Sequence, residues 1–328
     1  MNKQTDPRHP LNQESISVCI LTYKDAQLAA VYGLTDLLNT ASQLHNKARD
    51  SQSASKVFRV ECCGIEAISQ TQISALSDNV LIIPPCLGSM PPESVPWTTS
   101  LPELHNKGTL ICSICAGALY LAQSGLLDNR PATTHWSLAN VFTDRYPQVK
   151  LDIDKLLIDD GDIVTAGGLM AWVDLGLRLV ERFMGSSTML ATARYFLVDP
   201  GGREQRFYSS FSPSFNHGDA AVLKAQHWLQ KHSTETITVP MMAQAACLEG
   251  RTFIRRFHAA TRLNPSEYLQ QLRVSKAREL MEQTRQNVEE IAWQVGYEDA
   301  SAFRRVFQKI TGLTPRDYRK RFSSSQLS

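Results

Sequence analysis

Arginine side chains stand at matched positions in two helix patterns near the carboxyl end of the sequence. In the first pattern, Phe253 and Phe257 are one helical turn apart and predict a buried face. At about 100° per residue, Arg251 and Arg255 lie on the opposite side, with Ile254 on the flank. An outward arginine can bind guanine O6 and N7 with two hydrogen bonds in the DNA major groove. A solvated surface is the alternative interpretation of one such face.

The same face recurs fifty residues later in the sequence. Phe303 and Phe307 predict the buried side of this second helix. Ser301 and Arg305 face outward, with Arg304 beside them. Two outward faces at matched positions of an internal repeat favour two recognition helices over a solvated surface.

Each copy predicts a helix-turn-helix, in which a short helix and a tight turn position the arginine-bearing helix. The short helices carry the matched pairs Met242-Ala243 and Ile291-Ala292, which are 49 residues apart. Gly296 supplies a turn residue that tolerates positive φ in the second copy. The stretch from Pro265 to Glu282 predicts one helix of about 18 residues and about 27 Å. A helix of this length can hold two recognition helices about one DNA turn (~34 Å) apart.

Several motifs in this part of the chain follow a known family pattern, and they are Arg251-Thr252-Phe253-Ile254-Arg255-Arg256-Phe257, Tyr268-Leu269-Gln270-Gln271-Leu272-Arg273, Ala277-Arg278-Glu279-Leu280, Ile291-Ala292-Trp293-Gln294-Val295-Gly296-Tyr297, Phe303 and Thr311-Gly312-Leu313-Thr314-Pro315. On these motifs, residues 219–322 resemble the DNA-binding domain of AraC/XylS-type transcriptional regulators. Two positions depart from the pattern, because Cys247 replaces the first turn glycine and Arg262 replaces the glycine after the threonine. The resemblance implies that DNA is contacted by Arg251, Ile254, Arg255, Ala300, Ser301, Arg304 and Arg305.

Cys115 is the second group of chemical interest. It follows an apolar stretch, Gly108–Ile114, and precedes the small residues Ala116-Gly117-Ala118. A cysteine at a sharp turn from strand to helix is typical of a nucleophile elbow, where the helix dipole can lower the thiol pKa. A buried structural cysteine is the alternative. A redox or metal pair with Cys112 is disfavoured, because positions 112 and 115 of a strand face opposite ways and no second pair completes a metal site.

The first two hundred residues predict strands that alternate with helices, several of the strands being continuously apolar. Such a pattern is typical of an α/β sandwich around a mostly parallel sheet. The Pro-rich segment Pro84–Pro102 is interpreted as a surface loop. The expected strands cover residues 16–22, 57–63, 79–84 and 108–114, with a hairpin at 156–158 and 162–165. The expected helices cover residues 28–44 and 172–183, and a further helix follows Cys115-Ala116-Gly117-Ala118 and ends at Gln123.

A second resemblance rests on Gly117, Leu119 to Ala122, Gly125-Leu126-Leu127-Asp128, Ala132-Thr133-Thr134-His135-Trp136, Thr165-Ala166-Gly167-Gly168 and Trp172-Val173-Asp174-Leu175. On these residues, the part from 15 to 200 resembles the ThiJ/PfpI-like domain, which has the class I glutamine-amidotransferase-like fold. The resemblance implies a flavodoxin-like sheet, with Cys115 at the elbow and His135 nearby. We predict an effector site formed by Cys115, Ala116 and His135, and a hydrogen-bonded structural histidine is the alternative for His135.

The match to the hydrolytic members of this family is incomplete. Peptidase-like relatives place a histidine directly after the elbow cysteine, where this chain has Ala116. The acidic partner expected after the first strand is absent from the segment 26–30. A nucleophile needs a base and an orienting group within hydrogen-bond reach. The sequence therefore favours a ligand pocket over catalysis, with no cofactor and no metal.

Charge divides the chain into an acidic and a basic part. Residues 219–328 hold 17 Lys and Arg against 11 Asp and Glu, a net charge of +6, whereas residues 1–218 have a net charge of −4. A basic carboxyl-terminal module fits the binding of DNA phosphates. We expect a disordered tail at residues 1–14, the effector-binding domain at 15–200, a linker at 201–218 and the DNA-binding domain at 219–322.

The predicted compartment is the cytoplasm, without a membrane partner. Residues 1–14 are polar and predict no signal peptide, and no apolar run reaches the length of about 18 residues that a membrane span requires. The seven cysteines are an odd number, which is typical of free thiols in a reducing compartment.

The combined prediction is a sequence-specific transcriptional regulator, and specifically a homodimeric activator. Its partners would be double-stranded promoter DNA, RNA polymerase and a small metabolite bound near Cys115. By resemblance, that effector is an amino acid or a quaternary amine. Two alternatives stay open, namely a Cys115-dependent hydrolase, amidase or glyoxalase-like enzyme fused to a DNA-binding module, and a thiol-based oxidant sensor.

Overall fold

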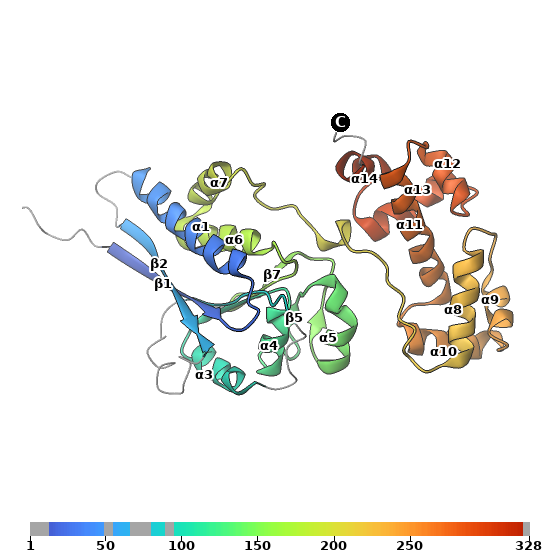
Figure 1. Cartoon of the computed structure of the whole chain (residues 1–328), viewed down its shortest axis with the longest axis horizontal. Helices are drawn as coiled ribbons and strands as arrows, with labels where there is room; N and C mark the ends of the chain where they lie inside the picture. The colour runs from blue at the N-terminus through green and yellow to red at the C-terminus, as the bar shows by residue number, and fades with distance from the viewer. Residues whose placement is uncertain (1–12, 49–54, 66–79, 89–94, 324–328) are drawn as a thin grey trace, which may run out of the picture. The chain divides into compact units, whose positions relative to one another are not determined.

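The chain divides into two compact units, Met1–Gln205 and Arg206–Ser328. The computed structural model describes residues 13–48, 55–65, 80–88 and 95–323 (Figure 1). The first unit is an α/β sandwich and the second is all-helical, which confirms the predicted fold class. Among the described residues, no helix is both long and apolar enough to cross a membrane.

In the described part of the first unit, the central sheet consists of β1 (Gln13–Thr22), β2 (Ser55–Gly64), β3 (Val80–Ile83), β4 (Leu110–Ile114), β7 (Leu157–Asp159) and β8 (Ile163–Ala166). The strand order is β2-β1-β3-β4-β8-β7. Neighbouring strands run parallel, except that β7 runs antiparallel to β8 and forms the predicted hairpin. Every residue of β3 and β4 is buried, as expected for parallel strands covered on both faces.

Helices cover both faces of this sheet (Figure 1). Successive side chains of β1 point to opposite faces, so Ile20 and Leu21 enter two different apolar clusters. The Ile20 cluster contains residues of α1 (Leu28–Lys47) and α6 (Trp172–Met184), with α7 (Ser186–Tyr195) packed on α1 and α6. The Leu21 cluster contains residues of α3 (Leu101–Asn106), α4 (Gly117–Gln123) and α5 (Ala139–Arg145). A separate parallel pair is formed by β5 (Pro131–Ala132) and β6 (Lys150–Leu151).

The prediction of a surface loop over Pro84–Pro102 is wrong from Pro96 onward. Pro96–Ser100 forms a 3₁₀ helix that continues into α3, and Trp97 and Leu101 are buried in the core. Each of these two helices has a proline in its first turn, where the missing N–H has no helical partner to lose. Residues 89–94 of this segment lie outside the described residues, as do residues 1–12 of the predicted tail. Gln13 and Glu14, at the end of that tail, already lie in β1.

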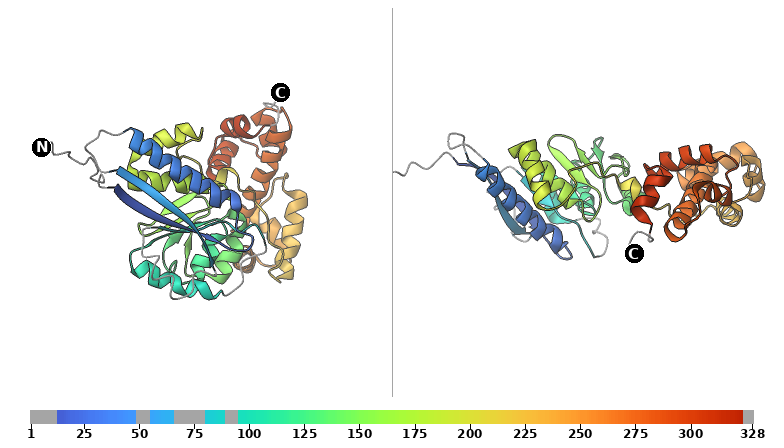
Figure 2. Two further views of the ribbon diagram at one scale, coloured as in Figure 1. Left: turned by 60° about the vertical axis from the view of Figure 1, so that its left-hand side comes forward. Right: turned by 90° about the horizontal axis from the view of Figure 1, so that it is seen from above.

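The described part of the second unit has seven α-helices, preceded by a 3₁₀ helix at Gln205–Phe207, and Figure 2 shows it from two further sides. The long α11 was predicted at 265–282 and contributes residues to two separate apolar cores. With 19 residues it is about 28 Å long. The helices are α8 (Ala220–His232), α9 (Val239–Ala245), α10 (Gly250–Thr261), α11 (Pro265–Gln283), α12 (Val288–Gln294), α13 (Ala300–Thr311) and α14 (Pro315–Phe322).

The two cores repeat the same aromatic geometry. Phe257 meets Tyr268 edge to face, with ring centroids 5.2 Å apart and ring planes at 89°. Phe307 meets Tyr318 in the same way, at 5.4 Å and 86°. Edge-to-face pairs of this kind stabilise a core beyond the burial of their area. The sequence repeat is therefore a structural repeat of two helix-turn-helix units.

The turns of the two units have left-handed backbones at matched positions. Cys247 has a φ of 55°, and Gly296, its counterpart, has a φ of 91°. Arg262 ends α10 with a φ of 60°, where Gly312 ends α13 with a φ of 76°. Cys247 and Arg262, which depart from the family pattern, thus adopt the conformation that glycine adopts in the second unit. A positive φ strains the backbone of a residue that has a side chain.

The segment 206–218, which we name the lead-in segment, packs on the helices of the second unit. Arg278 of α11 is buried, and its guanidinium donates to the carbonyl oxygens of Arg206, at 2.8 Å, and of Ser209. Further along, the ring of Phe211 packs edge to face on Tyr268 at 5.1 Å. The lead-in segment therefore contacts α11 at both cores. It occupies most of the stretch predicted as a linker.

Candidate nucleic-acid interface and effector site

The predicted DNA contacts lie on the open faces of α10 and α13. From residue 251 to 260 and from 301 to 310, exposed, half-buried and buried side chains follow each other in the same order. Arg251, Ile254 and Arg255 are exposed on α10. On α13, Ser301, Arg304 and Arg305 are exposed and Ala300 is half-buried. The phenylalanine spacing is the signal that predicts these faces, because each buried ring fixes the helix rotation.

Hydrogen bonds from the first turn fix where α13 begins. The Asp299 carboxylate accepts from the backbone N–H groups of Ser301 and Ala302, both at 2.9 Å. These two N–H groups hold the pKa of Asp299 below its usual value. Ala300 and Ser301 therefore stand in the first turn of the helix, which is the end that a recognition helix presents to base edges.

Two arginines of these helices have carboxylate partners that the sequence did not reveal. Arg256 binds Asp219 through two hydrogen bonds of 2.9 and 2.7 Å, and this pairing lowers the pKa of Asp219. Asp219 also caps α8, so Arg256 ties α10 to α8. Arg304 forms an ion pair with Glu289 of α12. No local sequence signal indicates the Asp219 pair, because its members are 37 residues apart.

The predicted elbow is present at the carboxyl end of β4. Cys115 stands between β4 and α4 with a φ of 55°, a strained value for a residue other than glycine. Its N–H donates to the Ala166 carbonyl at 2.7 Å, and its carbonyl accepts from the Thr134 hydroxyl at 2.8 Å. A Cβ at Gly117 would lie 2.7 Å from the Ile83 carbonyl oxygen, so the turn into α4 needs glycine.

The environment of the Cys115 thiol opposes its ionisation. The residue is 4% exposed, and burial raises its pKa to about 11, although the Ala116 N–H acts in the opposite direction. Burial also lowers the pKa of His135, which is half-buried. The His135 Nδ1 lies 2.7 Å from the Ser137 hydroxyl and accepts from the Ser137 N–H. Within the described residues, no hydrogen bond joins His135 to Cys115.

Gln205 is a buried residue that sequence reasoning missed. Its amide nitrogen donates to the carbonyl oxygens of Thr134, at 2.8 Å, and Lys155, at 2.9 Å. Its oxygen accepts from the N–H of Trp136 at 3.2 Å. Gln205 thereby clamps the segment that carries His135. The contact spans about seventy residues of sequence, so no motif could have indicated it.

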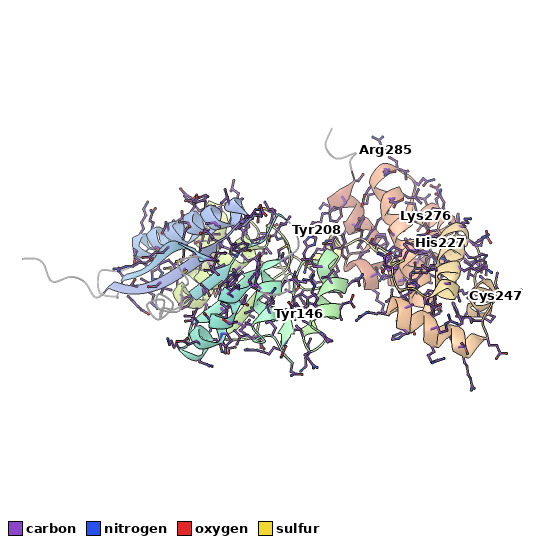
Figure 3. The ribbon with its side chains drawn as sticks, turned by 60° about the horizontal axis from the view of Figure 1, so that its bottom comes forward. Tyr146, Tyr208, His227, Cys247, Lys276 and Arg285 are labelled. Carbon is purple, nitrogen blue, oxygen red and sulfur yellow. The ribbon has the colours of Figure 1, made fainter. Side chains whose placement is uncertain are left out.

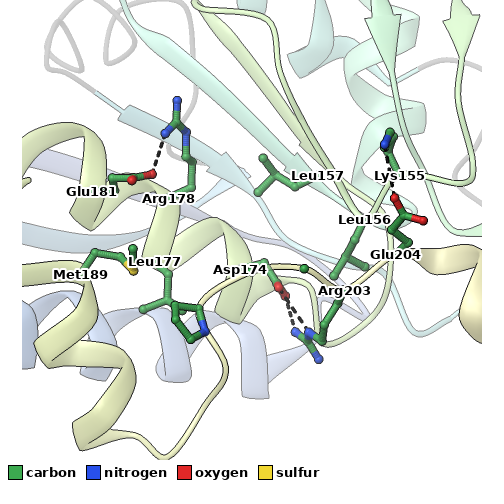
Figure 4. Close-up of a pocket in the computed structure, with 13 residues that line it drawn as sticks. Lys155, Leu156, Leu157, Asp174, Leu177, Arg178, Glu181, Met189, Arg203 and Glu204 are labelled. Atoms are coloured by element: carbon green, nitrogen blue, oxygen red, sulfur yellow. Dashed lines mark hydrogen bonds and ion pairs between the residues drawn. The ribbon is translucent and has the colours of Figure 1, made fainter. Parts of the chain in front are cut away.

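A cavity of about 360 Å³ opens elsewhere in the first unit, between β7, α6, α7 and the segment 200–204 (Figure 4). Its apolar wall includes Leu157, Leu177 and Met189. Its charged lining residues form ion pairs, namely Arg203 with Asp174, Lys155 with Glu204 and Arg178 with Glu181. Ligand pockets commonly have volumes of about 300–1,000 Å³. No sequence pattern indicated this cavity.

Cys247 is exposed in the turn that precedes α10 (Figure 3). The Lys224 ammonium lies 3.2 Å from its sulfur. The other exposed cysteine among the described residues is Cys62 on β2. Cys115 differs from both, because its thiol is enclosed by the sandwich.

Comparison with known proteins gives two family matches. Residues 242–321 match the model of a helix-turn-helix domain, and residues 76–182 match the DJ-1/PfpI family. The chain is 30% identical to the HTH-type transcriptional regulator ArgR of Pseudomonas aeruginosa, over 67% of this chain and 67% of the relative. It is 28% identical to the HTH-type transcriptional regulator CdhR of the same organism, over 70% of this chain and 67% of the relative. Among solved structures, an AraC family transcriptional regulator from Pseudomonas putida is 20% identical with a TM-score of 0.44, covering 55% of this chain and 99% of that one.

Proposed function

Since the chain belongs to the AraC/XylS-type transcriptional regulators that carry an N-terminal DJ-1/PfpI-like domain, we propose that it binds promoter DNA through α10 and α13. The observation that carries this proposal is the identical order of exposed and buried side chains on the two helices. The net charge of +6 on residues 219–328 supports attraction to phosphates. The contacts would come from Arg251, Ile254, Arg255, Ala300, Ser301, Arg304 and Arg305.

The first unit would control this binding through a small metabolite. The proposed pocket lies at the elbow and includes Cys115, Ala116 and His135. By resemblance to the family, the effector is an amino acid or a quaternary amine, and the regulator acts as a homodimer that activates transcription with RNA polymerase. Its promoter target would place it in the cytoplasm. An effector that binds one state of the protein better than another shifts the population toward that state, which changes DNA affinity.

We propose that the elbow binds a ligand without catalysing a reaction. Three observations support this. The thiol pKa is raised by burial, the position after Cys115 is alanine, and the Nδ1 of His135 is engaged by Ser137. A cysteine nucleophile requires a thiolate and a base that removes its proton.

The test of effector control is a thermal-shift screen of the full chain against amino acids and quaternary amines. A metabolite that raises the unfolding temperature should also change the affinity of the protein for its operator, the duplex that it selects from a randomised pool. The operator should in turn change the affinity for the metabolite by the same factor. A metabolite that binds but leaves operator affinity unchanged would argue against control by that ligand. Turnover of small amides or dicarbonyls that is lost in Cys115→Ser would instead support an enzyme.

A further inference from the structure

The two helix-turn-helix units differ at one pair of facing positions. In the second unit, Glu289 of α12 and Arg304 of α13 form an ion pair. The matched positions in the first unit, 49 residues before Glu289 and 50 residues before Arg304, are Pro240 and Ile254. Both members of a charged pair thus correspond to apolar residues. Because both positions differ together, the difference indicates that the two recognition faces contact different chemical groups on DNA.

Pro240 and Ile254 line one open hollow between α9 and α10. Val239, Ala243 and Leu248 add further apolar wall, and the remaining lining residues are Gln244, Gly250 and Arg251. Ile254 is 42% exposed on the same face as Arg251 and Arg255. A single exposed isoleucine is ordinary on protein surfaces. Ile254, however, lines an apolar hollow on the proposed DNA-binding face and lies next to the arginines.

We propose that this hollow seats the C5-methyl group of a thymine, so that the first unit reads an A·T pair through Ile254. The inference rests on the DNA binding proposed above. In the major groove, thymine is the base that presents a methyl group. Guanine or cytosine at this position would place a polar group against the apolar wall of Ile254 and Pro240. That polar group would lose its hydrogen bonds to water and gain none from the protein wall. The apolar wall therefore selects thymine by attraction and rejects a G·C pair.

The second unit supplies the internal contrast. Glu289 holds the Arg304 guanidinium through one terminal nitrogen, and the other N–H groups of Arg304 stay available for a base. An arginine positioned in this way suits guanine, which offers two acceptors in the major groove. The duplicated units would then read different bases at equivalent places in their half-sites.

The experiment begins with selection of duplexes by the full-length protein from a randomised pool at fixed salt. Each thymine of the selected operator is then replaced in turn by deoxyuridine, which lacks only the methyl group. For the wild type, we expect a loss of about fourfold in affinity at one thymine of the first unit's half-site, the effect of burying about one methyl group. In Ile254→Ala, the same replacement should have no effect, whereas Arg304→Ala should keep the wild-type sensitivity. Ile254 is exposed, so the alanine variant should fold, and its unfolding temperature is measured alongside.

A second variant transfers the ion pair to the first unit. Pro240→Glu combined with Ile254→Arg reproduces the residues of the second unit at the matched positions. Selection with this variant should replace the sensitive thymine by guanine. Retention of thymine there would overturn the inference, and so would equal uridine sensitivity in wild type and Ile254→Ala. If the wild type selects no sequence at all, both the proposed DNA-binding function and the thymine inference fail. If the wild type selects a specific operator but no deoxyuridine replacement lowers its affinity, only the thymine inference is refuted.

Discussion

At the scale of single residues, the chemistry of Cys115 follows from burial more than from its place at a helix terminus. The elbow gives it a left-handed backbone and a hydrogen bond from its N–H to Ala166. The strained turn from strand to helix is shared with nucleophile elbows. Enclosure in the sandwich raises the thiol pKa to about 11, which keeps the sulfur protonated near neutral pH.

This protonation predicts slow alkylation of Cys115. In the native full chain at pH 8, iodoacetamide should label Cys115 far more slowly than the exposed Cys62, and labelling of Cys115 should rise as the pH approaches 11. Peptide mass spectrometry resolves the two sites. Equal labelling of both cysteines at neutral pH would show a thiolate at the elbow, and would favour the oxidant-sensor or enzyme alternative.

At the scale of elements, the turn of the second helix-turn-helix unit depends on Gly296. Its φ is 91°, and a Cβ there would lie 2.8 Å from the Thr234 carbonyl oxygen. Gly296→Ala should therefore lower the free energy of unfolding by ~1–3 kcal/mol, the usual cost of such strain. Urea unfolding of the full chain measures the change, and hydrogen exchange assigns it to α12 and α13.

Gly250 is the matched control for this prediction. It stands at the first position of α10, where a Cβ would meet no atom within 4 Å. Gly250→Ala should leave the stability unchanged or raise it by up to ~1 kcal/mol, because alanine has the higher helix propensity. Equal losses in the two variants would refute the assignment of strain to the Gly296 turn.

Much of each element could be predicted from the sequence, because periodicity reports which face of a helix is buried. The paired phenylalanines gave the rotation of α10 and α13, and the apolar runs gave β3 and β4. The prolines of Pro84–Pro102 misled the prediction, since proline also begins helices. The contacts of Gln205, Arg256 and Arg278 depend on tertiary placement, and no local pattern encodes them.

At the scale of the whole molecule, the lead-in segment is the chain that joins the first unit to the helices of the second. It is held by Arg278, whose guanidinium also lies 5.4 Å from the ring centroid of Tyr318. Burial lowers the pKa of Arg278, and the two carbonyl oxygens that it binds would lose their donor in a variant. Arg278 therefore couples the position of this segment to the second helix-turn-helix core.

We expect Arg278→Met to destabilise the second unit by up to ~1–3 kcal/mol, because two partly buried carbonyl groups lose their donor. The lead-in segment should become sensitive to proteases within residues 206–218. Limited proteolysis of the full chain measures this, with Arg285→Met as the control because Arg285 is exposed outside the recognition helices (Figure 3). Unchanged protection in Arg278→Met would show that other contacts hold the segment.

The charge division of the molecule, with its basic part at residues 219–328, predicts steep salt dependence of DNA binding. Phosphate contacts set most of that dependence, whereas base contacts set the sequence preference. The outward arginines of α10 and α13 should therefore affect specificity, whereas an exposed arginine outside these helices, such as Arg285, should affect affinity alone.

The most direct test of the account is the affinity of the full chain for its selected operator and for a scrambled duplex, measured by fluorescence anisotropy at several salt concentrations. Arg255→Ala and Arg305→Ala should each weaken operator binding by ~1–3 kcal/mol and reduce the preference over the scrambled duplex. Arg285→Ala should preserve that preference. Wild-type affinity and preference in both Arg255→Ala and Arg305→Ala would contradict DNA recognition through these two helices.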